Sequence, residues 1–270
     1  MAAKKDNPLG MRLLEDGGPF VLPPTPCSQR RTEFFKRGNT ILGFYTVMSI
    51  VSKAGGDVIG QQEKQGKFKP DTPFRLKITD GNIAQMNYGL FKKCFANAGV
   101  HLTNQVFLML YGSFEAFIAD LVLDALTQIN TNDPYEEALR LMYTSKWRGK
   151  MDKIAQKLGV QLGTGIFLSK FQNIDMGFLG ERCPNPIEFL EKAADLRHRL
   201  VHYSGRADKQ FAKDYPKSGL SEGDIISLPF GLPMSMQPFF AHLTDVIDDA
   251  FCSKFGWQRT VVSVEKLTED

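Results

Sequence analysis

The sequence predicts a mainly α protein, a helical bundle with an irregular or partly β extension at its N-terminal end. Two observations predict this class. Apolar residues recur at helical spacing through most of the chain after residue 82, and an Asn-Pro-x-Glu start signal at residues 185–188 opens one of these segments. With 270 residues, 43% of them hydrophobic, the chain is long enough to bury a sizeable core.

The first 81 residues are the least regular part of the chain. Residues 1–29 are rich in Gly and Pro, which predicts an extended or mobile lead-in. Residues 30–54 have helical spacing, and the sequence Ala-Gly-Gly is expected to end that helix. Residues 55–81 predict a short hairpin or an irregular basic loop. This segment contains Lys64, Lys67, Lys69, Arg75 and Lys77.

The rest of the chain predicts a series of helices. They cover residues 82–98, 103–130, 134–158, a short stretch at 165–171, 185–203 and 233–255. The second is apolar almost all round, as expected of a central buried helix. Residues 224–229 predict a short strand, and the last residues a strand or frayed tail. We therefore divide the chain into the lead-in 1–29, a helix with basic loop at 30–81, a helical domain at 82–255 and a tail at 256–270.

Composition argues against several classes of protein. The four cysteines are far apart and form no Cys-x-x-Cys pair, which argues against a zinc site built on cysteine pairs and is typical of reduced thiols. There is no signal-peptide pattern, and no stretch reaches the ~18 uninterrupted apolar residues of a membrane span. We therefore expect a cytoplasmic protein with no membrane partner.

The helix at 185–203 holds the first unusual feature. On a helical wheel of ~100° per residue, Arg197 falls near the middle of a broad apolar arc that includes Ala194 and Val201. His198 and His202 share one flank of this arc, together with Glu191 and Asp195. An arginine in an apolar face must be paired or must face a wet interface, because burying an unpaired charge is costly.

Glu115 is the second unusual feature. It lies away from the narrow polar stripe of its helix, formed by Ser113, Asp120 and Asp124. A carboxylate on one central helix and an arginine on another invite pairing. The sequence leaves open whether Arg197 and Glu115 form only an internal ion pair or part of a functional site.

This set of side chains suits cleavage of RNA without a metal. Histidine can take and give a proton near neutral pH, and arginine offers a fixed charge that matches a phosphate. Two alternatives stay open. His198 and His202 could hold zinc with Asp195 or Glu191, although neighbouring arginines would oppose a cation. Cys183 and His202 could form a nucleophile and base, with no positive support.

The residues Arg197 to His202, Arg-His-Arg-Leu-Val-His, resemble the Arg-polar-x-x-x-His motif of HEPN domains. These domains are a helical ribonuclease fold found in toxins, anti-phage systems and RNA-processing factors. His198 occupies the polar position, where Asn is commonest. Residues 110–126, LYGSFEAFIADLVLDAL, are similar to an earlier helix of one HEPN branch. The resemblance covers roughly residues 82–255.

The resemblance implies an endoribonuclease of toxin or phage-defence type that needs no cofactor and leaves a 2′,3′-cyclic phosphate and a 5′-hydroxyl. His202 would be the principal acid–base, Arg197 would neutralise the scissile phosphate, and His198 would assist. Glu115 would hold Arg197 or a histidine in place. The resemblance also implies a homodimer, in which the motif helices of two subunits pack side by side around one composite site.

The partners expected are therefore an RNA substrate, a second copy of the chain and an antitoxin or sensor protein. The first 93 residues carry fifteen Lys and Arg against eight Asp and Glu, and this basic bias could guide an RNA backbone. The residues proposed for that role are Arg30, Arg31, Lys67, Lys69 and Arg75. The alternative function is a non-catalytic HEPN-like dimer that binds RNA or a protein.

Overall fold

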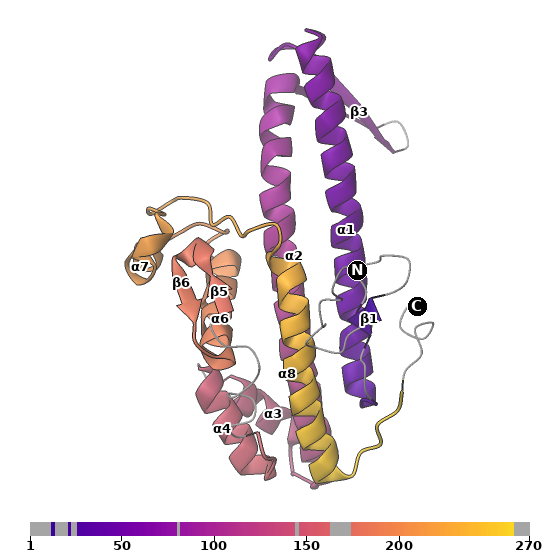
Figure 1. The fold of residues 1–270 in the computed structure, drawn as a ribbon, viewed down its shortest axis with the longest axis vertical. Coiled ribbons are helices and arrows are strands. Elements are labelled where there is room, and N and C mark those ends of the chain that lie inside the picture. The colour runs from indigo at the N-terminus through magenta and orange to yellow at the C-terminus, as the bar shows by residue number, and fades with distance from the viewer. Residues whose placement is uncertain are drawn as a thin grey trace, which may run out of the picture.

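A computed structural model of the chain describes residues 12–13, 21–22, 26–79, 82–143, 146–162 and 174–261. Two long antiparallel helices dominate it, α1 (Gln29–Lys64) and α2 (Tyr88–Gln128) (Figure 1). A third helix, α8 (Leu232–Phe255), lies along the half of α2 that is far from the α1–α2 connection. The predicted mainly α fold is confirmed.

Smaller elements form a second layer on one side of these long helices (Figure 1). The helices of this layer are α3 (Pro134–Met142), α4 (Trp147–Leu158), α6 (Pro186–His202) and α7 (Lys209–Asp214). Short 3-10 turns are η1 (Gly177–Leu179) and η2 (Pro216–Ser218). Three antiparallel strand pairs complete the described residues: β1 (Arg12–Leu13) with β2 (Val21–Leu22), β3 (Pro73–Thr79) with β4 (Asn82–Asn87), and β5 (Ile174–Met176) with β6 (Glu181–Cys183).

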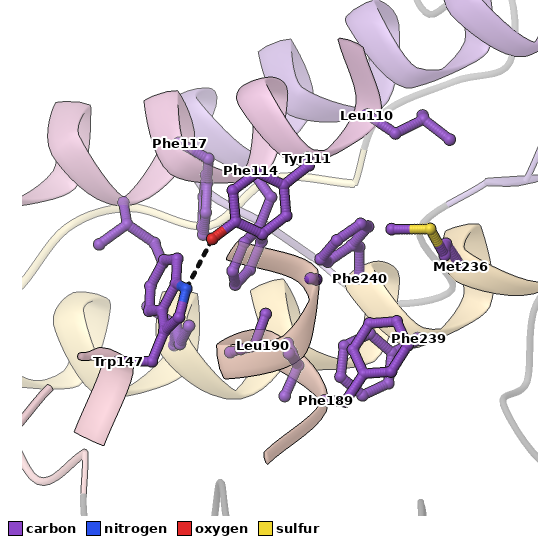
Figure 2. Packing of buried hydrophobic residues seen from close by; sticks show 14 of the residues in the cluster. Leu110, Tyr111, Phe114, Phe117, Trp147, Phe189, Leu190, Met236, Phe239 and Phe240 are labelled. Carbon is purple, nitrogen blue, oxygen red and sulfur yellow. Dashed lines mark hydrogen bonds between the residues drawn. The ribbon is translucent and has the colours of Figure 1, made fainter. Parts of the chain in front are cut away.

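The core lies where α2, α4, α6 and α8 meet (Figure 2). The rings of Phe114 and Phe240 stack with centroids 4.7 Å apart, and Phe189 packs on Phe239 at 4.5 Å. Each fully buried aromatic ring of this kind contributes about 1.5–3 kcal/mol to folding. The aromatic core therefore fixes α6 against α2 and α8, and this contact positions the motif helix.

The prediction that Ala-Gly-Gly ends the first helix is wrong, because α1 continues to Lys64. Gly55 and Gly56 lie against the ring of Phe95 on α2, and a Cβ atom at either glycine would be 3.5 Å from that ring. Helix-to-helix packing therefore offsets the low helix propensity of the two glycines. The start of α1 is capped by Ser28, whose hydroxyl accepts from the backbone N–H of Arg31.

Several other boundaries differ from the sequence prediction. The helix predicted from residue 82 begins only at Tyr88, because residues 82–87 form a strand, and it then runs unbroken past residue 102. Of the two alternatives for residues 55–81 the hairpin is present, but it pairs 73–79 with 82–87, and residues 55–64 belong to α1. The helix predicted at 134–158 is two helices, α3 and α4. The strand predicted at 224–229 is a single bridge between Arg206 and Ile225. The predictions for residues 165–171, for most of 1–25 and for 262–270 fall outside the described residues.

The capping predictions at Asn185 and Gly159 are confirmed. Asn185 accepts a hydrogen bond from the backbone N–H of Glu188 at 3.0 Å, with Pro186 as the first residue of α6. Gly159 ends α4 in the left-handed conformation, with a φ of 64°. These capping signals act within a few residues and depend little on tertiary contacts, so the sequence alone could predict them.

The predicted boundary after residue 81 does not separate two cores. It falls at the turn between β3 and β4. The helix before this turn shares one hydrophobic cluster with the helix after it, through Phe34, Phe35 and Leu42 of α1. The N-terminal helix is therefore part of the same bundle as α2 and α8.

Within the described residues, α2 is the one helix long and apolar enough to cross a membrane by length and composition. Half of its most apolar window is buried inside the bundle. The core helix of a soluble protein meets the same criterion, so length and composition alone do not assign α2 to a membrane.

Candidate active site

The two faces of α6 differ from the sequence prediction. Arg197 does not lie in an apolar face, because its side chain is 47% exposed. The buried arginine of this helix is Arg199, whose side chain is only 6% exposed. The wheel analysis counted Ala194 and Val201 as core residues, but neither is buried. Removing them narrows the apolar arc and leaves Arg197 outside it.

Arg199 is held by three carboxylates. Its Nε donates to Asp195 at 3.0 Å, one terminal nitrogen donates to Asp214 at 3.1 Å, and the other donates to Asp208. The guanidinium also lies over the ring of Phe211, 5.3 Å from its centroid. Burial alone would lower the pKa of Arg199, but the hydrogen bonds and charges of the carboxylates raise it. This cluster ties α6 to α7 and stabilises the fold.

A cleft of about 660 Å³ opens on the other side of α6, between α2, α3, α4 and α6. Two of the predicted site residues on α6 line it, together with the predicted carboxylate of α2. The lining residues that carry polar or aromatic groups are Tyr111, Glu115, Tyr143, Lys146, Trp147, Lys150, Glu191, Asp195, Arg197 and His198.

The predicted pairing of Arg197 with Glu115 is present. Nε of Arg197 lies 3.9 Å from Oε2 of Glu115, and Nζ of Lys150 lies 3.8 Å from Oε1 of the same carboxylate. Both separations exceed a normal hydrogen bond. Glu115 therefore lies between two cations and forms no short hydrogen bond with either of them.

Lys150 is a residue of this cleft that the sequence analysis missed. Its side chain is buried, and its ammonium lies over the ring of Trp147, 4.1 Å from the centroid. Burial lowers the pKa of Lys150, and the charges of Glu115 and Glu191 offset part of this effect. A usable signal was present, because residues 146–157 hold five Lys and Arg and a single acidic residue.

The aromatic floor beside Lys150 is fixed by a hydrogen bond. The indole Nε1 of Trp147 donates to the hydroxyl oxygen of Tyr111 at 2.7 Å (Figure 2). Burial, followed by the charge of Glu115, raises the pKa of Tyr111. Tyr111 is therefore a neutral structural group that orients Trp147 under the cleft.

The two histidines are adjacent and accessible. The rings of His198 and His202 have centroids 4.6 Å apart, and both side chains are exposed. His198 lines the cleft, whereas His202 lies one turn further along α6 and does not line it. The structure thus groups Arg197, His198 and Glu115 at one opening, with His202 beside them on the same exposed face.

The predicted RNA-guiding residues do not form one surface. Arg31 is buried and its guanidinium lies 2.6 Å from Asp245, so its prediction is wrong. Arg30 donates two hydrogen bonds to Asp124, at 2.7 and 2.9 Å, so its charge is already paired. Lys67, Lys69 and Arg75 are exposed near the β3–β4 hairpin.

That hairpin is distant from the cleft. Glu115 comes 27 residues after the first residue of α2, and at 1.5 Å per residue this is about 40 Å along the helix. Figure 1 places the hairpin at the end of α1 and α2 that is far from α6. A contact between RNA and the hairpin would therefore involve a separate part of the strand.

The geometry also bears on the metal alternative. Among the residues that the structure describes, no three His, Cys, Asp or Glu side chains are grouped to hold a metal ion. The two carboxylates proposed as ligands have other partners. Asp195 accepts from Arg199 and from the hydroxyl of Tyr215 at 2.9 Å, and Glu191 accepts from the backbone N–H of Arg148 at 3.2 Å. Cys183 is buried in β6.

No protein-family model matches the chain, and no curated protein or solved structure is significantly similar to it.

Proposed function

We propose that the chain is a metal-independent endoribonuclease of the HEPN type. The observation that supports this most strongly is the grouping of Arg197 and His198 at the opening of a cleft that contains Glu115, with the exposed ring of His202 4.6 Å from that of His198. These side chains supply a proton acceptor, a proton donor and a fixed positive charge. Cleavage of an RNA phosphodiester by its own 2′-hydroxyl needs these three functions.

In the proposed reaction, His202 removes the proton of the 2′-hydroxyl, and the resulting oxygen attacks the adjacent phosphorus. The bond from phosphorus to the 5′-oxygen breaks, and His198 assists by donating a proton to the leaving oxygen. Arg197 neutralises the charge that develops on the phosphate oxygens. The products carry a 2′,3′-cyclic phosphate and a 5′-hydroxyl.

The active form in this proposal is a homodimer through α6. Val201 is 50% exposed between the two histidines and Tyr203 is also exposed, so the motif face presents apolar surface to solvent. Covering it with the same face of a second copy would bury these side chains and bring two sets of Arg and His together. An antitoxin or sensor protein is the expected regulator, in a toxin or phage-defence role.

The alternative proposal is a non-catalytic dimer that binds RNA or a protein. The exposed apolar groups of the motif face suit such a dimer equally well. The two proposals separate on one measurement, since only the first expects new RNA ends.

The test is cleavage of total cellular RNA by purified protein in excess EDTA. Wild type, Arg197→Ala and His202→Ala are compared with His101→Ala, which removes an exposed histidine of α2 outside the cleft. We expect wild type and the control to cut and to leave cyclic-phosphate ends, and both motif variants to be inactive. Equal cutting by His202→Ala contradicts the assignment, and RNA binding by wild type with no cutting favours the non-catalytic dimer.

A further inference from the structure

We infer, building on the proposed function, that the cleft between α2, α4 and α6 binds one unpaired nucleotide of the RNA next to the scissile phosphate. Lys150 is its phosphate-binding cation and Tyr143 is the surface on which its base stacks. The proposed function alone assigns no role to either residue.

Two cations of the cleft, Lys150 and Arg197, are placed to bind a phosphate group. Lys150 and Arg197 approach the same carboxylate from two sides, at 3.8 and 3.9 Å, so their ammonium and guanidinium groups converge on one point. Neither is bound closely enough to exhaust its donors. Two cations face one carboxylate here, so the group keeps a net positive charge, and a phosphate oxygen entering beside Glu115 would find a donor on each cation. Arg197 links this position to the scissile phosphate.

The two other carboxylates that line the cleft have partners outside the pair of Lys150 and Arg197. Asp195 accepts a hydrogen bond from Arg199 at 3.0 Å, which offsets part of its charge. Glu191 accepts a hydrogen bond from the backbone N–H of Arg148 at 3.2 Å, and its charge acts on Lys150. The whole segment from Lys146 to residue 157 is strongly basic, so α4 adds a positive field along one wall of the cleft.

The exposed aromatic ring of Tyr143 offers a surface on which a base can stack. Tyr143 ends α3 at the rim of the cleft and is 82% exposed, beside the partly exposed Leu139. A single exposed tyrosine is ordinary, but a tyrosine that lines the same cleft as two convergent cations provides the combination by which proteins hold single-stranded nucleic acid. The aromatic face stacks on a base, and the cations follow the backbone.

The shape of the cleft argues for an unpaired nucleotide. Its volume of about 660 Å³ is within the range of ligand pockets that enclose a small molecule. A base reaches such a pocket only when it is free of its duplex partner, and sequence-selective proteins read RNA at unpaired loops and ends for this reason. We therefore expect preference for single-stranded RNA.

The experiment measures binding without cleavage. The probe is a short single-stranded RNA with 2′-O-methyl groups throughout, which lacks the attacking hydroxyl, and its duplex serves for comparison. Fluorescence anisotropy gives Kd for wild type, Lys150→Met and Tyr143→Ala. Their matched controls are Lys213→Met, an exposed lysine of α7, and Tyr135→Ala, an exposed tyrosine at the other end of α3.

We expect Tyr143→Ala and Lys150→Met each to weaken binding about tenfold, since stacking on one base is worth that much and a lost charged hydrogen bond has a similar effect. The controls should change Kd by less than about twofold. Lys150→Met should also lower the slope of log Kd against log salt by about 0.7, the value for one phosphate contact in a single strand. Lys150→Arg should restore that slope, whereas a purely structural role for Lys150 would leave the slope unchanged in all variants.

The outcomes separate this inference from the proposed function. Unchanged Kd in both cleft variants, with cleavage by wild type that still needs Arg197 and His202, overturns the nucleotide site and leaves the ribonuclease assignment standing. Binding that depends on Lys150 and Tyr143 without any cleavage supports the site and contradicts the assignment. Equal affinity for the duplex overturns the preference for an unpaired nucleotide.

Discussion

The two faces of α6 use the same residue type in opposite ways. Arg199 is buried and donates hydrogen bonds to three carboxylates, so every nitrogen of its guanidinium has a partner. Arg197, two residues earlier, is half exposed, and among the described residues one carboxylate lies within 4 Å of it, at a distance too long for a hydrogen bond. The difference indicates that Arg199 stabilises the fold and that Arg197 is available to a ligand.

The largest expected effect lies on the exposed face. Arg197→Ala should lower the rate of RNA cleavage by about 10²–10³-fold, since it removes a charge that the proposed transition state needs. His202→Ala should lower it by about 10²–10⁴-fold through loss of acid–base catalysis. Neither change should move the Tm by more than a degree or two, because both side chains are exposed. Cleavage assays and thermal unfolding on the same preparations test the contrast.

On the buried face of α6, a substitution of Arg199 should lower the stability of the fold. Arg199→Met leaves three carboxylates close together without their shared cation, and we expect a loss of about 3 kcal/mol in the free energy of unfolding, as for other broken buried ion pairs. Urea unfolding measures it. A matched control is Lys209→Met, whose ammonium is exposed and 4.0 Å from Glu222, and which should change stability by under about 0.5 kcal/mol.

A result with the two arginines exchanged would break the comparison. If Arg199→Met unfolds like wild type while Arg197→Ala loses several kcal/mol, then Arg197 is the structural arginine.

The wheel shows why part of this site was readable from sequence and part was not. The capping signals at Asn185 and Gly159 act within a few residues of themselves, so they located both helix ends correctly. Which arginine is buried depends on what covers each face. Asp208 and Asp214, which begin and end α7, decide this, and they lie outside α6, so a helical wheel of α6 does not include them. The pairing of Arg197 with Glu115 was still found, because each was unusual on its own helix.

The long helices illustrate the same limit. Gly55 and Gly56 predict a helix end from local propensity, but Phe95 of α2 packs over them. Lys150 was missed for a related reason. Its role comes from the ring of Trp147 beneath it and from Glu115 on another helix, and neither contact is visible in the spacing of α4.

A smaller effect is expected from a substitution at the N-cap of α6, which affects both faces of the helix and so sharpens the comparison between them. Asn185→Ala removes the hydrogen bond that caps α6, and we expect a loss of about 1 kcal/mol of stability. Since the cap lies more than three turns before Arg197, cleavage by the folded fraction should stay within about twofold of wild type. Urea unfolding and an assay well below the Tm provide the measurement. A large loss of activity at full folding would mean that the site depends on the whole helix.

The smallest predicted effect concerns α3 and α4, which form one wall of the cleft. Ion pairs of Glu137 with Arg140 and with Lys157 lie on these two helices. Hydrogen bonds from Arg140 and then from Lys157 lower the pKa of Glu137 from 4.5 to about 2. Because the pKa is lower in the folded state, the unfolded chain binds more protons in this window, so the contribution is full above pH 4.5 and is lost as the pH falls toward 2. The Tm of wild type should therefore drop relative to that of Glu137→Gln across this range. A constant difference between the two proteins would show that these exposed pairs do not hold α3 against α4.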